Sequence, residues 1–249
     1  MRLGVNIDHV ATLRNSRGTY YPSPLEAAKI VESSGADQVT IHLREDRRHI
    51  KEQDVIDIID NINIDINLEL APTDEMINFA IKHKPNFICL VPEKREELTT
   101  EGGINVNLKS VQKAVEKLHK YNIKVCLFIE PSIEAIKKSS ELNVEIVEIH
   151  TGKYANLKDY LEPYMSNHQI KEKEELSKII KCAKYCESIK MQCHAGHGLN
   201  FSNVVPIAKI KEISELNIGH SLICLSIFDG LSNVIKKMIT TINQSRNNI

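Results

Sequence analysis

Residues 23–43 read SPLEAAKIVESSGADQVTIHL, and this stretch contains one complete helix-to-strand unit. Ser23, Pro24 and Glu26 are typical of a helix start, because serine caps the first turn, proline fits the first helical position and glutamate completes a capping box. Gly35 is typical of a helix end. The run QVTIHL (38–43) that follows is apolar and β-branched, which indicates a strand covered on both faces. The sequence therefore predicts a helix from 23 to 34, followed by a buried strand.

The same alternation continues along the whole chain. Eight apolar runs have the character of buried strands: 3–10, 38–43, 65–70, 87–92, 124–130, 145–152, 191–196 and 216–224. Helical periodicity or helix-start signals lie between them, at 73–84, 110–122, 132–142 and, over a longer and more charged stretch, 168–190. Eight such units in 249 residues match the usual size of a (β/α)₈ barrel.

We therefore predict one TIM-barrel domain over residues 1–249, with extra helices. A doubly wound open sheet is the alternative. That fold is expected to carry a glycine-rich phosphate turn after its first strand, and the residues there read NIDHVATLRN.

The composition argues against several classes of partner. The 32 basic and 33 acidic residues leave a net charge of -1, so nothing global attracts nucleic acid or an anionic membrane. No apolar run approaches the length of about 18 residues that a membrane span needs. The N-terminus MRLGVNIDHV lacks the apolar core of a signal peptide. We expect a cytoplasmic protein that binds small molecules.

Six cysteines are scattered through the sequence, at positions 89, 126, 182, 186, 193 and 224. A cytoplasmic location favours free thiols. Cys182 and Cys186 are four residues apart on a predicted helix and so share a face. A two-thiol metal or redox site is one interpretation of this pair, and two small buried hydrophobic residues is the other.

Polar side chains follow almost every predicted strand. Residues that can carry protons or bind anions occur at these ends, including His9, His42, Glu69, Glu148, His194, His197 and His220. Taken singly, each is more simply a packed polar residue or a salt bridge at the rim. In a closed barrel, however, the carboxyl ends of the strands face one cavity, and buried charges without partners cost several kcal/mol. Repetition at so many strand ends therefore indicates a catalytic site.

The kinds of residue present favour one class of chemistry. Several imidazoles and two strand-end carboxylates, Glu69 and Glu148, suit proton transfer. Arginines after the second strand, together with glycines after the seventh and eighth, suit phosphate. The sequence carries no Gly-x-Ser-x-Gly turn and no His-Glu-x-x-His motif. From the residues alone we predict an enzyme that enolises or condenses small phosphorylated carbonyl compounds.

Several long segments also resemble one known family. They are GVNIDHVATLRNSRG (4–18), HLREDRRHI (42–50), NLEL (67–70), LVPEKREELTTEGG (90–103), VEIHTG (147–152), AGHGLN (195–200) and ELNIGHSLI (215–223). In this order, and nearly end to end, the chain is similar to the pyridoxine 5'-phosphate synthase family of vitamin B6 biosynthesis. The resemblance implies a TIM barrel with added helices, a homo-octamer, and catalysis without metal or organic cofactor.

The resemblance also implies a reaction and a set of site residues. In that reaction 3-amino-2-oxopropyl phosphate condenses with 1-deoxy-D-xylulose 5-phosphate, giving pyridoxine 5'-phosphate, inorganic phosphate and water. His42 and Glu69 match proton acceptors, His197 matches a proton donor, and Glu148 matches a residue that stabilises the transition state. The residues that match the aminoketone phosphate site are Asn6, Arg17, His197, Gly219 and His220. Those that match the deoxyxylulose phosphate site are Asp8, His9, Arg44, His49 and Thr99, and Gly198 is a further predicted substrate-binding position.

Three features leave alternatives open. Ile223, Cys224 and Leu225 stand where the family pattern has glycine and arginine, so either an arginine contact with phosphate is lost or the backbone of Gly219 and His220 replaces it. His194 replaces an expected asparagine and is either an extra proton carrier or a packed bystander. The segment TTEGG (99–103) is either a closing lid or a plain loop.

Two other functions would suit the same barrel. One is an isomerase or aldolase that acts on a single sugar phosphate. An aldolase of the Schiff-base type needs a strand-end lysine, and only Lys94, just after the fourth strand, comes near that position. The other is a phosphate-binding module without catalysis, which would not need His42 and Glu69 as well as the arginines.

Overall fold

The computed structural model describes residues 1–93, 102–159 and 166–247, and eight parallel strands in these residues close into a barrel. The strands are β1 (Arg2–Asn6), β2 (Gln38–His42), β3 (Asp65–Leu70), β4 (Phe87–Leu90), β5 (Lys124–Ile129), β6 (Ile146–His150), β7 (Gln192–Gly196) and β8 (Glu215–Ile218). Each strand pairs with its neighbours in sequence, and β1 closes the barrel against β8, with Gly4 opposite Asn217. The predicted (β/α)₈ barrel is confirmed, and the open doubly wound sheet is excluded.

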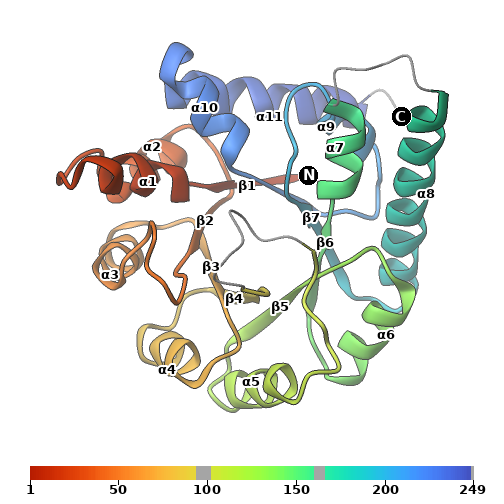
Figure 1. The fold of residues 1–249 in the computed structure, drawn as a ribbon, viewed down its shortest axis with the longest axis horizontal. Helices are drawn as coiled ribbons and strands as arrows, with labels where there is room; N and C mark the ends of the chain where they lie inside the picture. The colour runs from red at the N-terminus through yellow and green to blue at the C-terminus, as the bar shows by residue number, and fades with distance from the viewer. Residues whose placement is uncertain (94–101, 160–165, 248–249) are drawn as a thin grey trace.

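Helices surround the barrel on all sides (Figure 1). They are α1 (Asp8–Arg17), α2 (Pro24–Ser33), α3 (Glu52–Asn61), α4 (Asp74–His83), α5 (Lys109–Lys120), α6 (Ile133–Glu141), α7 (Gly152–Asp159), α8 (Ser166–Ser188), α9 (Val204–Ala208), α10 (His220–Asp229) and α11 (Leu231–Asn247). Helices α1, α7 and α10 are additional to a simple alternation of strand and helix, as the prediction of extra helices requires.

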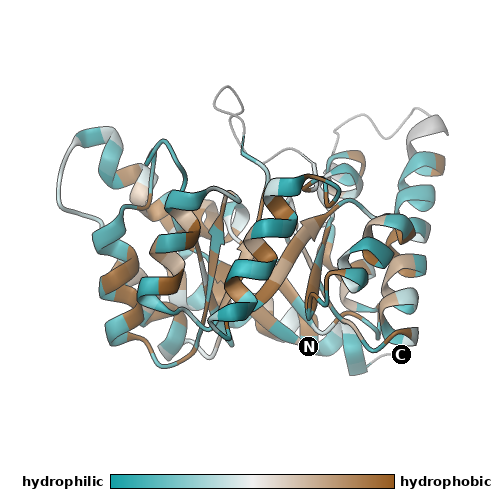
Figure 2. Cartoon of the chain, turned by 90° about the horizontal axis from the view of Figure 1, so that it is seen from below, coloured by the Kyte–Doolittle hydropathy of each residue, from teal (hydrophilic) through white to brown (hydrophobic). Residues whose placement is uncertain are grey.

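The sequence signals for individual helices correspond to contacts in the structure. Ser23 caps α2, because its hydroxyl oxygen accepts a hydrogen bond from the Glu26 backbone N–H at 3.4 Å. Helix α5 buries Val111, Ala114 and Leu118, which lie on one face at three- and four-residue spacing. The helices turn apolar faces to the strands and polar faces outward (Figure 2).

Several strands are shorter than the sequence predicted, and at β1 and β8 the difference matters for the site. The predicted strand 3–10 ends at Asn6, and α1 begins at Asp8; the predicted strand 216–224 ends at Ile218, and α10 begins at His220. In both places the apolar run continues from the strand into the buried face of a helix, and periodicity cannot separate the two over a few residues. The early helix starts bring Asp8 and His220 to the mouth of the barrel.

All six cysteines are free thiols, and Cys224 is the one that is exposed. Cys182 and Cys186 are buried on the inner side of α8, in the main hydrophobic core. Their position agrees with the packing interpretation of this pair. Among the described residues, no helix combines the length and apolar character that crossing a membrane requires.

The apolar side chains packed between the helices and the strands should determine the stability of the fold. Ile58 on α3 is fully buried, whereas Ile30 on α2 is 40% exposed. We expect Ile58→Ala to lower the free energy of unfolding by about 2–5 kcal/mol, because it leaves a cavity in the core. The matched change Ile30→Ala should stay within about 0.5 kcal/mol of the wild type. Urea unfolding followed by circular dichroism measures both, and equal losses would contradict this assignment of the core.

Candidate active site

A cavity of about 520 Å³ opens at the carboxyl ends of the barrel strands. Twelve of the fourteen predicted site residues line it: Asn6, Asp8, His9, His42, Arg44, His49, Glu69, Glu148, His197, Gly198, Gly219 and His220. Of the other two, Arg17 lies exposed in the last turn of α1 and is not among the lining residues. Thr99 is outside the described residues, as is most of the candidate lid. The roles of Arg17 and Thr99 stay predictions.

His42 lies at the end of β2 between two glutamates. Its Nε2 atom is 2.8 Å from Glu93 Oε1, and its Nδ1 atom is 3.6 Å from Glu69 Oε2. Burial alone would raise the pKa of Glu93, but the hydrogen bonds from His42 and the Glu45 backbone, with the charge of Arg44, outweigh it and lower the pKa. Glu93 is therefore an ionised partner that orients the imidazole.

Asp8 ties the first two strands together at the cavity. Its Oδ1 atom accepts a hydrogen bond from the backbone N–H of His42 at 2.8 Å. Its Oδ2 atom accepts one from Asn6 Nδ2 at 2.8 Å, and Asn6 Oδ1 accepts one from the Asp8 backbone N–H at 3.0 Å. Because Asp8 is nearly buried, these bonds set the position of His42 as well as its own.

Two carboxyl groups in the cavity hold protons unusually tightly. Burial raises the pKa of Glu69 well above its ordinary value, and repulsion from neighbouring carboxylates, Asp8 first, raises it further. Burial and the charge of Glu215 raise the pKa of Glu148 to about 8, against a hydrogen bond from Asn217 that lowers it. Glu148 can therefore exchange a proton near neutral pH, and the pKa of Glu69 is shifted in the same direction, as acid–base catalysis requires.

Histidines cover the opposite wall of the cavity. His197 follows β7, with its ring centroid 5.0 Å from that of His150. Burial, together with the neighbouring His150 and His220, lowers the pKa of His197 to about 4. His9 and His220 meet edge to face at 4.7 Å, and burial lowers the pKa of His9 as well.

A cationic corner lies where β2 leads into its loop. Arg44 is 3% exposed, and its Nε atom is 3.5 Å from Asp46 Oδ1. Arg48 Nη2 is 2.7 Å from Asp46 Oδ2. These guanidinium groups overcome the effect of burial and lower the pKa of Asp46 to about 2. The two arginines and His49 form a corner suited to a phosphate or carboxylate.

A second anion-binding surface lies across the cavity, at the start of α10. Gly219 precedes the ten-residue helix, and the first amides of a helix have no partners within it and favour negative charge. Gly198 lies beside it with a positive φ of 76°. A Cβ atom there would lie 2.8 Å from Ala155 Cβ, so only glycine lets the loop pack this closely.

Five further cavity residues and one partner of His42 were not predicted as site residues. The cavity lining also includes Thr12, Arg48, Val91, Phe128 and Asn217, and Glu93 holds His42. Glu93 and Asn217 carry a signal in the sequence, since both are polar groups at or just after strand ends. Phe128 and Val91 carry none, because in the sequence they resemble any other buried strand residue.

Two groups of described residues place metal-ligating atoms within 4.8 Å of one another. Asp8, His42 and His49 form one group, in the cavity itself. Cys89, Cys126 and Glu148 form the other, on neighbouring strands. The first group consists of residues expected to bind substrate, and catalysis without metal stays a prediction.

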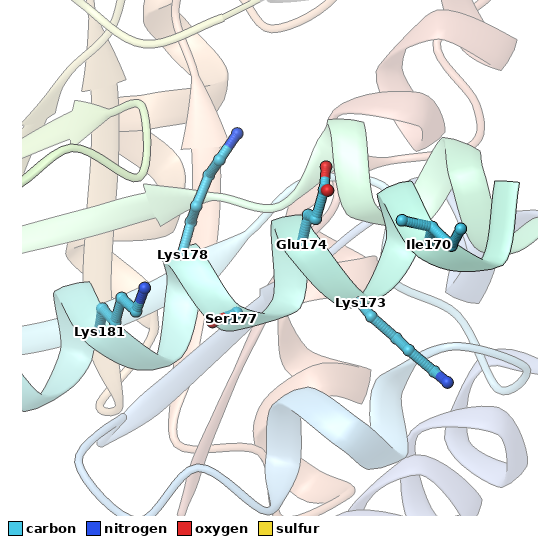
Figure 3. A pocket seen from close by; sticks show the side chains of 6 residues that line it. All are labelled: Ile170, Lys173, Glu174, Ser177, Lys178 and Lys181. Carbon is cyan, nitrogen blue, oxygen red and sulfur yellow. The ribbon is translucent and has the colours of Figure 1, made fainter. Parts of the chain in front are cut away.

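A hollow on the outer face of α8 differs from the barrel cavity. Residues of this one helix line it: Ile170, Lys173, Glu174, Ser177, Lys178 and Lys181. Its lysine side chains point in different directions and do not converge on one point (Figure 3). Lys178 is already paired with Glu175 at 2.7 Å. We assign no site to this hollow.

Comparison with known proteins places the chain in a family. The sequence-family model described as "Pyridoxal phosphate biosynthesis protein PdxJ" matches residues 3–244. The chain belongs to the PdxJ family. The pyridoxine 5'-phosphate synthase of Ehrlichia chaffeensis is 49% identical over 247 residues, covering 98% of each chain. That of Wolbachia pipientis is 50% identical over 248 residues, covering 98% of this chain and all of the relative. The synthase of Aliivibrio fischeri is 50% identical over 238 residues, covering 95% of this chain and 94% of the relative.

Solved structures of low identity share the fold of this PdxJ family member. An N-(5'-phosphoribosyl)anthranilate isomerase from Pyrococcus furiosus has a TM-score of 0.59 at 15% identity, with full coverage of both chains. An orotidine 5'-monophosphate decarboxylase from Methanocaldococcus jannaschii also has 0.59, at 12% identity, covering 97% of this chain and 98% of that one. These similarities concern the barrel alone.

The residues that depart from the family pattern lie in different surroundings. Ile223 is buried on α10, and the Cys224 sulfur lies 3.5 Å from His220 Nε2. His194 is 1% exposed, and its Nδ1 atom lies 3.1 Å from Glu215 Oε1. His194 is not among the residues that line the cavity. The packed-bystander interpretation therefore fits its position better than that of a proton carrier.

The surroundings of His197 lead to a prediction for the free protein. With a pKa of about 4, its imidazole should be neutral at pH 7 and gain a proton only in acid. Its stabilising contribution is therefore complete above the unfolded pKa of about 6.5 and is lost as pH falls toward 4. Histidine ring NMR signals recorded from pH 4 to pH 8, assigned with His197→Gln, measure this titration. A midpoint near 6.5 would contradict it.

Proposed function

We propose that this PdxJ family member condenses 3-amino-2-oxopropyl phosphate with 1-deoxy-D-xylulose 5-phosphate to give pyridoxine 5'-phosphate, inorganic phosphate and water. One observation carries the proposal: two anion-binding surfaces face each other across a cavity that holds two carboxyl groups of raised pKa. Among the described residues, no lysine lines this cavity, and Lys94, the candidate for a Schiff base, lies outside those residues.

The two anion-binding surfaces suit two phosphorylated substrates. The start of α10, with Gly198 and His197, suits the aminoketone phosphate. The corner with Arg44 and His49 suits the phosphate of the deoxysugar, because a guanidinium binds phosphate through paired hydrogen bonds. Holding both reactants in one cavity can contribute up to about 7–11 kcal/mol toward the barrier of their reaction.

The carboxyl groups and His42 suit the proton transfers between the bound molecules. Imine formation needs an acid that converts a departing hydroxide into water, and the later ring closure needs a base that removes a C–H proton. Glu69, whose pKa is raised well above its ordinary value by burial and by neighbouring carboxylates, lies 3.6 Å from His42 Nδ1 and can exchange a proton with it. Glu93 holds the other nitrogen of His42 and stabilises the imidazolium that results.

Substrate binding prepares His197 for its role as proton donor. In the empty cavity its pKa of about 4 leaves it neutral. A phosphate dianion at the start of α10 adds negative charge beside the imidazole and raises its pKa, because an opposite charge favours the protonated form. The substrate thereby supplies the condition under which His197 can donate a proton.

We also infer that the enzyme works in the cytoplasm as a homo-octamer. Neighbouring helices α1 and α10 carry exposed apolar side chains, and the residues concerned are Leu13, Tyr20, Tyr21, Ile227 and Phe228, with the tyrosines just after α1. An apolar surface of this kind is typical of contacts between subunits. The six free thiols suit a reducing compartment.

The proposed role of Glu69 has a direct test. Glu69→Gln removes the exchangeable proton but preserves the size of the side chain, so turnover should fall by about 10²–10⁴. The measurement is formation of pyridoxine 5'-phosphate and release of phosphate with both substrates present, and with each one alone. Thermal melting checks that the variant is folded.

Glu141→Gln is the matched control, since Glu141 is exposed on α6, away from the cavity. Its turnover should equal that of the wild type. Full activity of Glu69→Gln, or phosphate release by the wild type from one substrate alone, would contradict the proposal.

A further inference from the structure

A chain of buried hydrogen bonds runs beneath the cavity and ends on Glu148. Asn217 Nδ2 donates to Glu148 Oε2 at 2.7 Å. On the other side of the same amide, Asn217 Oδ1 accepts from Gln38 Nε2 at 2.9 Å and from Thr40 Oγ1 at 3.1 Å. Gln38 Nε2 also lies 3.1 Å from Thr40 Oγ1, so the hydroxyl can accept from Gln38 while it donates to Asn217.

This arrangement determines which way the Asn217 amide faces. Two donors point at its oxygen, and therefore its nitrogen must face Glu148. Gln38 and Thr40 are 0% exposed and Asn217 is 5% exposed, so water does not compete for these bonds. With the amide reversed, its oxygen would face the Glu148 carboxylate and its nitrogen would face the Gln38 Nε2 donor, which is costly in a buried site.

This chain of hydrogen bonds spans β1 and β7, and each of these strands has a glycine where the bonds pass it. The bond from β2 to β8 passes Gly4 on β1, where a Cβ atom would lie 2.1 Å from Asn217 Oδ1 and 2.8 Å from Gln38 Nε2. Glu148 on β6 reaches β8 past Gly196 on β7, where a Cβ atom would lie 2.2 Å from Glu148 Oε1. Side chains from alternate strands share a layer in barrels of this kind, and these two glycines make room for that layer.

We infer that Gln38 and Thr40 are positioning residues that act through Asn217 to hold the Glu148 carboxylate in its catalytic orientation. Neither Gln38 nor Thr40 lines the cavity, so neither is expected to touch substrate. The inference rests on the proposed function for the role of Glu148 in turnover, but the geometry of the chain does not depend on that function.

The protonation of Glu148 offers a way to observe this chain. The groups that face or act on its carboxyl are Asn217 and Glu215 on β8, Glu69 on β3, and the thiols of Cys89 and Cys126 on β4 and β5. Glu215 raises the pKa of Glu148, whereas the N–H donor of Asn217 lowers it. Loosening the Asn217 amide should therefore raise the pKa of Glu148.

Thr40→Val is the test variant, because it removes the hydroxyl and preserves the shape of the side chain. The pKa of Glu148 is read from ¹³C NMR of carboxyl-labelled glutamate in the full chain, with its signal assigned by Glu148→Gln. We expect this pKa to rise above that of the wild type. We expect kcat to fall about 10- to 100-fold with KM little changed, because a small misplacement of a catalytic group can cost about 10²-fold.

Two matched variants separate positioning from a general loss of structure. Thr40→Ser retains the hydroxyl and should restore both the pKa of Glu148 and kcat. Ser139→Ala removes a fully buried hydroxyl on α6 that donates only to the Ala135 carbonyl, so it should alter stability without moving the titration of Glu148. A Thr40→Val variant whose Glu148 titrates as in the wild type would overturn the inference.

Gln38→Met and Gly4→Ala provide tests that leave Thr40 in place. Gln38→Met removes the other donor to Asn217, and the methyl group of Gly4→Ala would displace the Asn217 amide. Both should raise the pKa of Glu148, and Gln38→Met should have little added effect once Asn217→Leu has broken the chain of hydrogen bonds.

If the wild type makes no pyridoxine 5'-phosphate but the pKa of Glu148 still shifts, the proposed function fails and the positioning inference stands. Additive effects of Gln38→Met and Asn217→Leu would overturn the inference.

Discussion

Two carboxyl groups that share one cavity, Glu148 buried and Glu69 partly buried, are the constraint on which the rest of the site depends. Glu69 and Glu148 come from β3 and β6, and the charge of Glu148 is one of the causes that raise the pKa of Glu69. Carboxylates in such surroundings are expensive unless protons or hydrogen-bond donors compensate them. The compensation comes from His42 near Glu69, and from Asn217 at Glu148. The hydrogen-bonded network beneath the cavity follows from this requirement.

The same cavity separates anion binding from proton transfer. The cationic corner uses arginine side chains held by Asp46, whereas the start of α10 uses backbone amides and close glycine packing. A phosphate at either surface can therefore anchor a reactant while its carbonyl or amine reaches the carboxyl groups and imidazoles. The local arrangement of charge can bind phosphate in this way although the net charge of the whole chain is -1.

The polar layer inside the barrel shows how distant segments become one functional unit. Gln38, Asn217 and Glu148 are separated by scores of residues in sequence, and each looks unremarkable on its strand. They meet because Gly4 and Gly196 remove side chains that would otherwise fill the same layer. A barrel interior is usually packed with apolar side chains, and here part of it is used to orient one carboxyl group.

The amino-acid sequence by itself determined the alternation of strands and helices, because apolar periodicity and caps such as Ser23 are local signals. It also determined the chemical class of the strand ends, since His42, Glu69 and Glu148 follow apolar runs that had to be buried. The limits of β1 and β8 were not determined, because one apolar run served both a strand and the helix after it.

Only the tertiary structure decided which groups face each other. It paired His42 with Glu93, placed His194 against Glu215 away from the cavity, and left Arg17 exposed on α1. It also raised the pKa of Glu69 and lowered that of His197. These properties depend on distances and burial across strands, and no periodicity along one segment of the chain encodes the separation of two others.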